Sequence, residues 1–253
     1  MFETLYFEGK SKKTCLIIPV INEGKRLISF IQRLYDQRIF VLCDIIIVDG
    51  GSVDGSISRY HLALLNVRGV ITMTNKSGGL SAQLRAAYSF SIDTGYQYFI
   101  TIDGNNKDDP AAIPLFIDYL INGYDFVQAS RFIKGGLEIN TPLIRLIAIK
   151  LIHAPILSLA SGFNWSDTTQ GFRGYSRNLL TSSKVAPLRE FFVGYSLLAY
   201  MSFIAPRKGF KCIEVPTTRA YPSGIVPTKI NSISHFLNLF LTLIMASTGR
   251  YNP

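Results

Sequence analysis

Apolar runs that are typical of buried strands alternate with helical stretches through the first half of the chain, and this alternation constrains the fold most. The expected elements are strands at 14–20, 41–48, 70–73, 98–102 and 124–129, and helices at 25–36, from about 54, at 80–93 and at 110–120. Such an order forms a mostly parallel sheet that is covered on both faces. The sequence therefore predicts an α/β fold.

Polar side chains cluster where these strands end. Glu23 follows the first strand, Asp49 ends the second, Asp103 ends the fourth and Arg131 follows the fifth. Ligands of open α/β sheets bind outside the carboxyl ends of the strands. We therefore expect these side chains to share one cleft.

The composition favours an anionic partner and an apolar surface. The 253 residues include 26 Lys and Arg against 17 Asp and Glu, and only 17% are charged, where about 25% is usual. A basic balance suits nucleotide phosphates or anionic lipid. No motif for reading DNA or RNA is visible, so no nucleic-acid partner is expected. The N-terminus lacks a signal-peptide stretch, so we expect a cytosolic domain from Thr14 onward.

Two of the clusters have residue types that suit a nucleotide. A carboxylate at Asp49, beside glycines that let the chain turn, can accept hydrogen bonds from a base or ribose, and Asp54 is expected to cap the next helix. Oxygen ligands at Asp103 and Asn105 can hold a divalent ion that bridges a diphosphate. The alternative for the second cluster is a polar turn before a helix that begins at Pro110.

The second half of the chain begins with a strongly apolar segment, Leu143–Ala154. Its polar residues, Arg145, Lys150 and His153, fall on one arc of a helix, and Pro155 is expected to interrupt it. Twelve helical residues rise about 18 Å, which is shorter than a hydrocarbon core of about 30 Å. We expect an amphipathic helix at a membrane interface; the alternative is a buried core helix.

The C-terminal segment 230–249 has no formal charge when His235 is neutral. A polar stripe of Asn231, His235, Asn238 and Thr242 runs along one helical face. This pattern predicts an amphipathic helix on a surface or partner, with a marginal transmembrane segment as the alternative.

Six sequence motifs, in order, resemble those of family 2 glycosyltransferases. The first three are I-P-V-I-N-E, V-D-G-G-S-V-D-G-S and the turn D-G-N, at 18–23, 48–56 and 103–105. The later three, Q-A-S-R-F-I-K-G-G, D-T-T-Q-G-F-R-G-Y and G-F-K-C-I-E-V-P, are similar to the branch with dolichol-phosphate mannose synthase and polyprenyl-phosphate glycosyltransferases. The resemblance covers about residues 14–230.

This resemblance implies a GT-A fold, a Rossmann-like and mostly parallel sheet flanked by helices, with amphipathic interface helices. The domain would span 14–230, with a nucleotide-binding half at about 14–130 and an acceptor half at about 131–230. Residues 1–13 would form an N-terminal extension, and 231–253 a C-terminal amphipathic helix. The implied function is inverting sugar transfer from a UDP- or GDP-linked donor to a polyprenyl-phosphate or glycan acceptor, at the cytoplasmic face of a membrane. A homo-oligomer is a further possibility.

The resemblance also implies roles for individual residues. The candidates are Asp103, Asp167, Arg131 and Arg173 for catalysis, Pro19, Glu23, Asp49, Gly79, Lys107 and Lys229 for substrate binding, and Asp103 and Asn105 for metal. Arg131 would meet the acceptor phosphate, and Arg173 would lie on the acceptor side. A hydroxyl acceptor would need a carboxylate base, for which Asp167 is preferred over Asp108 and Asp109, whereas a lipid phosphate would not.

The chain departs from the family pattern at three positions. Gly50 stands where the family has a second Asp, Asn105 replaces the second Asp of Asp-x-Asp, and Lys107 replaces a polar possible metal ligand. A lysine there can supply part of a metal's charge toward phosphate. We still expect Mg²⁺ or Mn²⁺ as cofactor.

Two other classes of function are alternatives for an α/β chain of this kind. A nicotinamide-dependent oxidoreductase would carry G-x-G-x-x-G after the first strand, and the segment 19–24 lacks it. A non-catalytic module that binds sugar nucleotides or a membrane stays open, because two acidic motifs are incomplete.

Overall fold

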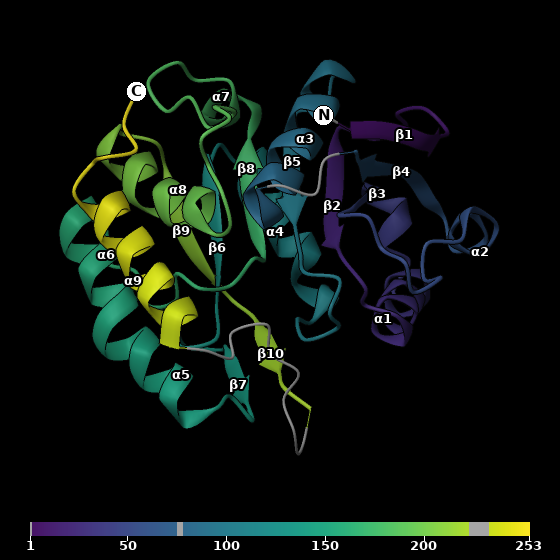
Figure 1. The fold of residues 1–253 in the computed structure, drawn as a ribbon. Helices are drawn as coiled ribbons and strands as arrows, with labels where there is room; N and C mark the ends of the chain where they lie inside the picture. The colour runs from purple at the N-terminus through teal and green to yellow at the C-terminus, as the bar shows by residue number, and fades with distance from the viewer. Residues whose placement is uncertain (1, 75–77, 223–232) are drawn as a thin grey trace.

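A mixed eight-stranded sheet lies at the centre of the computed structural model, which describes residues 2–74, 78–222 and 233–253 (Figure 1). Among these residues the strand order is β1 (Phe2–Phe7), β4 (Val67–Met73), β3 (Asp44–Asp49), β2 (Thr14–Val20), β5 (Tyr98–Thr101), β8 (Arg173–Ser176), β6 (Phe126–Ser130) and β9 (Cys212–Pro216). A small second sheet pairs β7 (Leu137–Ile139) with β10 (Thr218–Ala220).

Most of the large sheet is parallel, which confirms the predicted α/β class. Strands β4, β3, β2 and β5 run in one direction, and β6 runs parallel to β9. Strand β8 is antiparallel to both β5 and β6. Strand β1 pairs antiparallel with β4 at the edge, so the segment expected as an extension, 1–13, adds a strand that the sequence did not predict.

Helices cover both faces of this sheet (Figure 1). They are α1 (Lys25–Asp36), α2 (Arg59–Leu64), α3 (Gly79–Asp93), α4 (Ile113–Ile121), α5 (Leu143–Ala148), α6 (Ala154–Ser161), α7 (Arg177–Leu180), α8 (Ser196–Arg207) and α9 (Ile233–Ser247). Two 3₁₀ turns, η1 (Ile39–Val41) and η2 (Pro110–Ala112), and a π-helical turn, η3 (Ile149–His153), complete the described elements.

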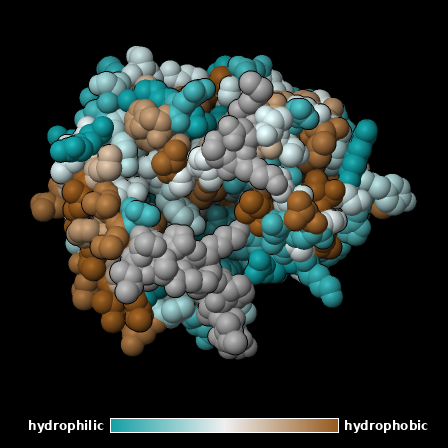
Figure 2. Space-filling model, in the orientation of Figure 1, coloured by the Kyte–Doolittle hydropathy of each residue, from teal (hydrophilic) through white to brown (hydrophobic). Residues whose placement is uncertain are grey.

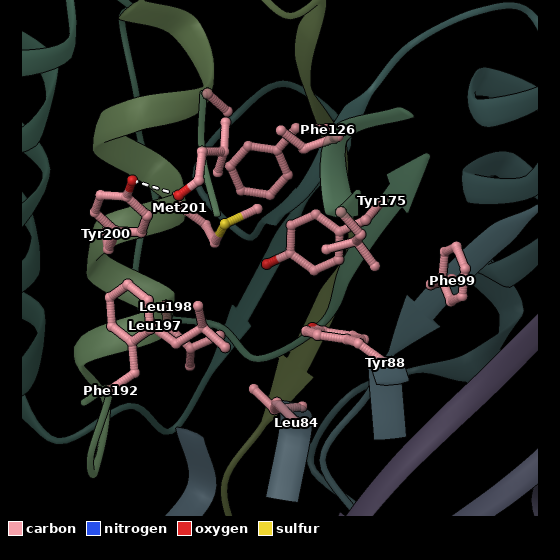
Figure 3. Close-up of a cluster of buried hydrophobic side chains, with 14 of the residues drawn as sticks. Leu84, Tyr88, Phe99, Phe126, Tyr175, Phe192, Leu197, Leu198, Tyr200 and Met201 are labelled. Atoms are coloured by element: carbon pink, nitrogen blue, oxygen red, sulfur yellow. Dashed lines mark hydrogen bonds between the residues drawn. The ribbon is translucent and has the colours of Figure 1, made fainter. Parts of the chain in front are cut away.

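The core has two layers because successive strand side chains point to opposite faces. Cys15 and Ile17 of β2 pack in the layer that α3 and α8 cover, whereas Leu16 and Ile18 pack in the layer that α1 and α4 cover. Figure 3 shows aromatic side chains of the first layer, where Phe126 and Tyr175 stack with their ring centroids 5.1 Å apart.

The helix that was expected to begin near Asp54 begins at Arg59 instead. The Asp54 carboxylate accepts the Gly24 backbone N–H at 2.7 Å and both the N–H and hydroxyl of Ser56, so it does not cap α2. Gly55 has φ +73, in the left-handed region, which is not helical. Asp54 therefore ties the loop after β3 to the start of α1.

The prediction that Pro155 interrupts the apolar helix is wrong. The chain stays helical from Leu143 to Ser161 as α5, η3 and α6. Inside a regular α-helix, a proline lacks the N–H for the backbone hydrogen bond, and its ring clashes with the carbonyl four residues earlier. The π-helical turn Ile149–His153 just before Pro155 changes this backbone spacing and so accommodates the proline. These 19 residues are long and apolar enough to cross a membrane.

This helix is not a buried core helix, because only 17% of its apolar window is buried. Its exposed large hydrophobic side chains are Leu143, Ile144, Ile147, Leu151, Ile152 and Leu159. Figure 2 shows hydrophobic side chains gathered on the side of the molecule where Figure 1 places α5 and α6. We call this set of six residues the apolar face of α5–α6.

Helix α9 packs against α6 and α8. Leu243 and Ala246 are buried there, while Leu237, Phe240 and Leu241 are exposed. The predicted amphipathic helix is thus present in the described part of the tail. Asn231 and Lys229 lie outside the described residues.

Candidate active site

A cavity of about 870 Å³ lies at the carboxyl ends of β2 and β5 and reaches α5, η3 and α9. Seven of the predicted site residues line it: Pro19, Glu23, Gly79, Asp103, Asn105, Lys107 and Arg131. Asp49, Asp167 and Arg173 are not among its lining residues, and Lys229 lies outside the described residues.

Asp103 stands two residues beyond the end of β5. Because Gly171 has no side chain, the Asp103 carboxylate can lie close to the backbone at Gly171. A Cβ at Gly171 would meet Asp103 Oδ1 at 2.5 Å, so a larger residue there would displace the carboxylate. Asp103 Oδ2 accepts from Arg219 Nη2 at 3.3 Å and from Asn105 Nδ2 at 3.4 Å. The carboxylate is therefore held by a guanidinium that the sequence motifs did not predict.

Arg219 lies on β10 and joins two carboxylates at the cavity wall. Its Nη1 donates to Asp108 Oδ2 at 2.5 Å, and its Nη2 reaches Asp103. Burial lowers the pKa of Arg219, but Asp108 and Asp103 outweigh that effect and raise it well above its usual value. In the sequence, Arg219 is a single arginine in a short segment after Pro216 and belongs to none of the motifs.

Three cationic side chains contact Tyr221. Arg145 Nη1 donates to its hydroxyl at 2.9 Å, Lys107 Nζ lies 4.8 Å from its ring centroid, and Arg219 Cζ lies 5.7 Å from it. Burial raises the pKa of Tyr221, but Arg219 and Arg145 lower it more strongly, to about 8. Burial and Arg219 lower the pKa of Lys107.

The structure places Asp167, the predicted general base for a hydroxyl acceptor, outside the lining of the cavity. Its carboxylate is fully buried and pairs with Arg131, Oδ2 to Nε 2.7 Å. Burial raises the pKa of Asp167, but Arg131 and hydrogen bonds outweigh it and lower the pKa. Because it also accepts from Gln170 and Thr169, Asp167 has no open side toward the cavity and instead orients Arg131.

Arg173 is likewise placed away from the cavity, contrary to its predicted position on the acceptor side. It is fully buried, and its guanidinium donates to the backbone carbonyls of Thr168, Gln170 and Leu198 at 2.7–2.9 Å. These bonds hold the segment before β8 against α8. We assign Arg173 a structural role.

The turn after β3 presents Gly50 to the cavity instead of Asp49. Asp49 is 4% exposed, and its Oδ1 accepts the Ser52 N–H at 2.8 Å. Gln83 of α3 donates to the carbonyls of Val20 and Val48 behind the turn. Gln83 also lines the cavity, and no sequence motif pointed to it.

His153 was expected on a polar helix face, and it lines the cavity instead. Its Nδ1 lies 2.6 Å from Thr168 Oγ1. Burial, with a smaller effect of Arg173, lowers the pKa of His153 to about 4, so the ring is neutral at physiological pH.

The residues at the expected metal site fit a divalent ion poorly. Asp103 is already paired with Arg219, and Asn105 Oδ1 accepts the Lys107 backbone N–H at 3.2 Å. Within the described ranges, no group of three His, Cys, Asp or Glu side chains could hold a metal ion. Hard divalent cations take several oxygen ligands, and here one carboxylate faces two cationic side chains.

The sequence model of the family described as Glycosyl transferase family 2 matches residues 15–182, more than half of the chain. The chain belongs to this family. It is therefore a glycosyltransferase, and its sheet with flanking helices is the GT-A fold that the motifs predicted.

Two characterised relatives and a solved structure illustrate the similarity. A polyprenol monophosphomannose synthase of Mycolicibacterium smegmatis is 29% identical over 210 residues, which cover 82% of this chain and 77% of that protein. An undecaprenyl-phosphate mannosyltransferase of Micrococcus luteus is 26% identical over 203 residues, covering 80% and 81%. A glucosyl-3-phosphoglycerate synthase of Mycobacterium tuberculosis, in complex with Mn²⁺, UDP and phosphoglyceric acid, superposes with a TM-score of 0.63 at 18% identity, covering 96% of this chain and 78% of that one.

Proposed function

We propose that this glycosyltransferase moves a sugar from a nucleoside diphosphate to a polyprenyl phosphate at the cytoplasmic surface of a membrane. The observation that carries the proposal is that one cavity is lined by both cationic and apolar side chains, which we call its charged end and its apolar end. Lys107, Arg131 and Arg219 line the first, and Ile149, Leu239, Phe240 and Leu243 line the second. A charged donor and a lipid acceptor can thus meet in one space.

The charged end suits the donor. It lies outside the carboxyl ends of β2 and β5, where ligands of such sheets bind. Pro19, Glu23 and Gly50 line it and would face the nucleoside, while Lys107 and Arg219 would face the diphosphate. Cationic donors bind phosphate oxygens with short, strong hydrogen bonds.

The apolar end suits a lipid acceptor and a membrane surface. It is walled by α5, η3 and α9, and Ile144 and Ile152 belong both to this wall and to the apolar face of α5–α6. A polyprenyl chain on the membrane would contact these apolar side chains as it enters the cavity. Two relatives named for polyprenol and undecaprenyl phosphate support this acceptor class.

The chemistry follows from the charges of the two substrates. A phosphate oxygen of the acceptor attacks the anomeric carbon, the bond from that carbon to the diphosphate oxygen breaks, and the electron pair leaves with the nucleoside diphosphate. Attack opposite the leaving group inverts the anomeric centre. The acceptor phosphate is already anionic and needs no strong base, which agrees with the enclosed position of Asp167. Arg131, held by Asp167, would bind that phosphate.

A transfer assay tests this function. The purified chain is mixed with vesicles that contain undecaprenyl phosphate and with a panel of radiolabelled UDP- and GDP-sugars. We expect one donor to give organic-soluble label, and Arg131→Gln to lose most of that activity while a surface variant, Lys134→Gln, retains it. Nucleotide-sugar binding without label transfer to any lipid phosphate or glycan would contradict an enzyme and favour the non-catalytic alternative.

A further inference from the structure

The site around Tyr221 contains more positive than negative charge. Lys107, Arg145 and Arg219 all lie against this ring or its hydroxyl, and all three line the cavity. No salt bridge to Lys107 occurs within residues 2–74, 78–222 and 233–253. We call Lys107, Arg145 and Arg219 the Tyr221 cation cluster.

Two carboxylates balance part of this cluster. Asp103 and Asp108 both pair with Arg219. Three cations against two anions leave one net positive charge. This net positive charge attracts an anionic diphosphate without a metal.

Two of the oxygen atoms that could hold a metal already accept hydrogen bonds within the protein. Asp103 Oδ2 accepts from both Arg219 and Asn105, and Asn105 Oδ1 accepts from the Lys107 backbone. A divalent ion on Asp103 would also lie near the Arg219 guanidinium, and the repulsion between them in this partly buried site would weaken its binding.

We propose that the Tyr221 cation cluster neutralises the donor's diphosphate in place of a divalent cation, so that the nucleotide binds without metal. This inference rests on the proposed function. The lysine supplies a compact charge, and the two arginines supply planar sets of N–H donors that match phosphate oxygens. The substitutions at Asn105 and Lys107 then act together: one removes a metal ligand, and the other supplies the missing charge.

Calorimetric titration of UDP and GDP into the full chain, in EDTA and in Mn²⁺, tests the proposal directly. We expect the Kd of the preferred nucleotide to agree within about twofold in the two buffers. A tenfold difference in Kd would correspond to about 1.4 kcal/mol of binding free energy. Lys107→Gln should weaken binding in EDTA by about tenfold or more. Lys211→Gln is the matched control, because Lys211 Nζ also lies over a tyrosine, 4.1 Å from the Tyr124 ring, but at the opposite end of the sheet.

A second variant reverses the substitution. Asn105→Asp combined with Lys107→Gln should bind the nucleotide weakly in EDTA and recover when Mn²⁺ is added. Wild-type binding that is lost in EDTA and restored by Mn²⁺ would overturn the inference and leave the proposed function standing. An unchanged Kd for Lys107→Gln would also overturn it. Failure to bind any nucleotide in either buffer would reject the proposed function itself.

Discussion

Buried ion pairs at the cavity wall fix the direction of the side chains that face the ligand. Arg131 is 3% exposed and Arg219 is 6% exposed, yet both line the cavity. Each is held by a more deeply buried aspartate, Asp167 for the first and Asp108 for the second. Removing one partner of such a pair leaves an uncompensated charge, which costs more than the pair contributes.

Asp167→Asn is expected to destabilise the fold because it removes the negative charge while keeping the shape of the side chain. Breaking a buried pair from one side typically costs about 3–5 kcal/mol, and urea unfolding measures it. The exposed Asp118 provides the control, since Asp118→Asn should change stability by less than about 0.5 kcal/mol. Wild-type stability of Asp167→Asn would contradict the role of this pair in holding the fold.

His153 makes stability depend on pH. Its pKa of about 4 in the fold lies below the usual 6.5, so the unfolded chain takes up a proton first as the pH falls. Stability from this residue is present above about pH 6.5 and is lost between 6.5 and 4, up to about 3 kcal/mol. Urea unfolding of the wild type and His153→Gln across this range measures the difference. Equal pH dependence of the two proteins would contradict the assignment.

At the scale of elements, the π-helical turn before Pro155 has the largest consequence. It joins α5 to α6, and nineteen helical residues rise about 28 Å, where the predicted twelve would rise about 18 Å. Arg145 and His153 of this helix face the cavity while Leu151 and Leu159 are exposed. A helix with cavity-facing polar groups and one apolar face suits the membrane interface.

Replacing Leu151 and Leu159 by serine should weaken binding to lipid vesicles without unfolding the protein. The two side chains are 72% and 90% exposed. Each leucine that enters an apolar phase contributes about 1.5–3 kcal/mol, so losing both should reduce partitioning by about a hundredfold or more. Vesicle co-sedimentation measures this.

Val53→Ser with Leu64→Ser is the matched control. These side chains are also exposed; Leu64 belongs to α2, which lies on the other side of the molecule from α5 and α6 (Figure 1), and Val53 belongs to the loop before α2. Equal binding by the two double variants would show that the apolar face of α5–α6 is not the membrane contact.

Element types were predictable where periodicity was strong, as at β2 and α1, and less so where local bonds intervened. The segment after Asp54 looked helical, but its carboxylate binds Gly24 and Ser56 instead. Strand β1 was not predicted because its segment is short and has only one buried residue. Its pairing with β4 decides its conformation.

At the scale of the whole molecule, the sequence located the site through strand ends but not its charge partners. Glu23 and Asp103 line one cavity as expected, whereas Asp49 is enclosed beside it. Arg219 comes from a two-stranded sheet that forms only when β7 and β10 meet. No local pattern records such a long-range contact, so its role could be found only in three dimensions.

We propose that the charged end of this cavity holds the diphosphate of a nucleotide next to an apolar entry for lipid. A crystal structure of the protein with its preferred nucleoside diphosphate tests this arrangement. We expect phosphate oxygens within hydrogen-bond distance of Lys107 and an arginine of the Tyr221 cation cluster, with the nucleoside beside Pro19 and Gly50. A nucleotide bound elsewhere, or with its diphosphate away from these cations, would contradict it.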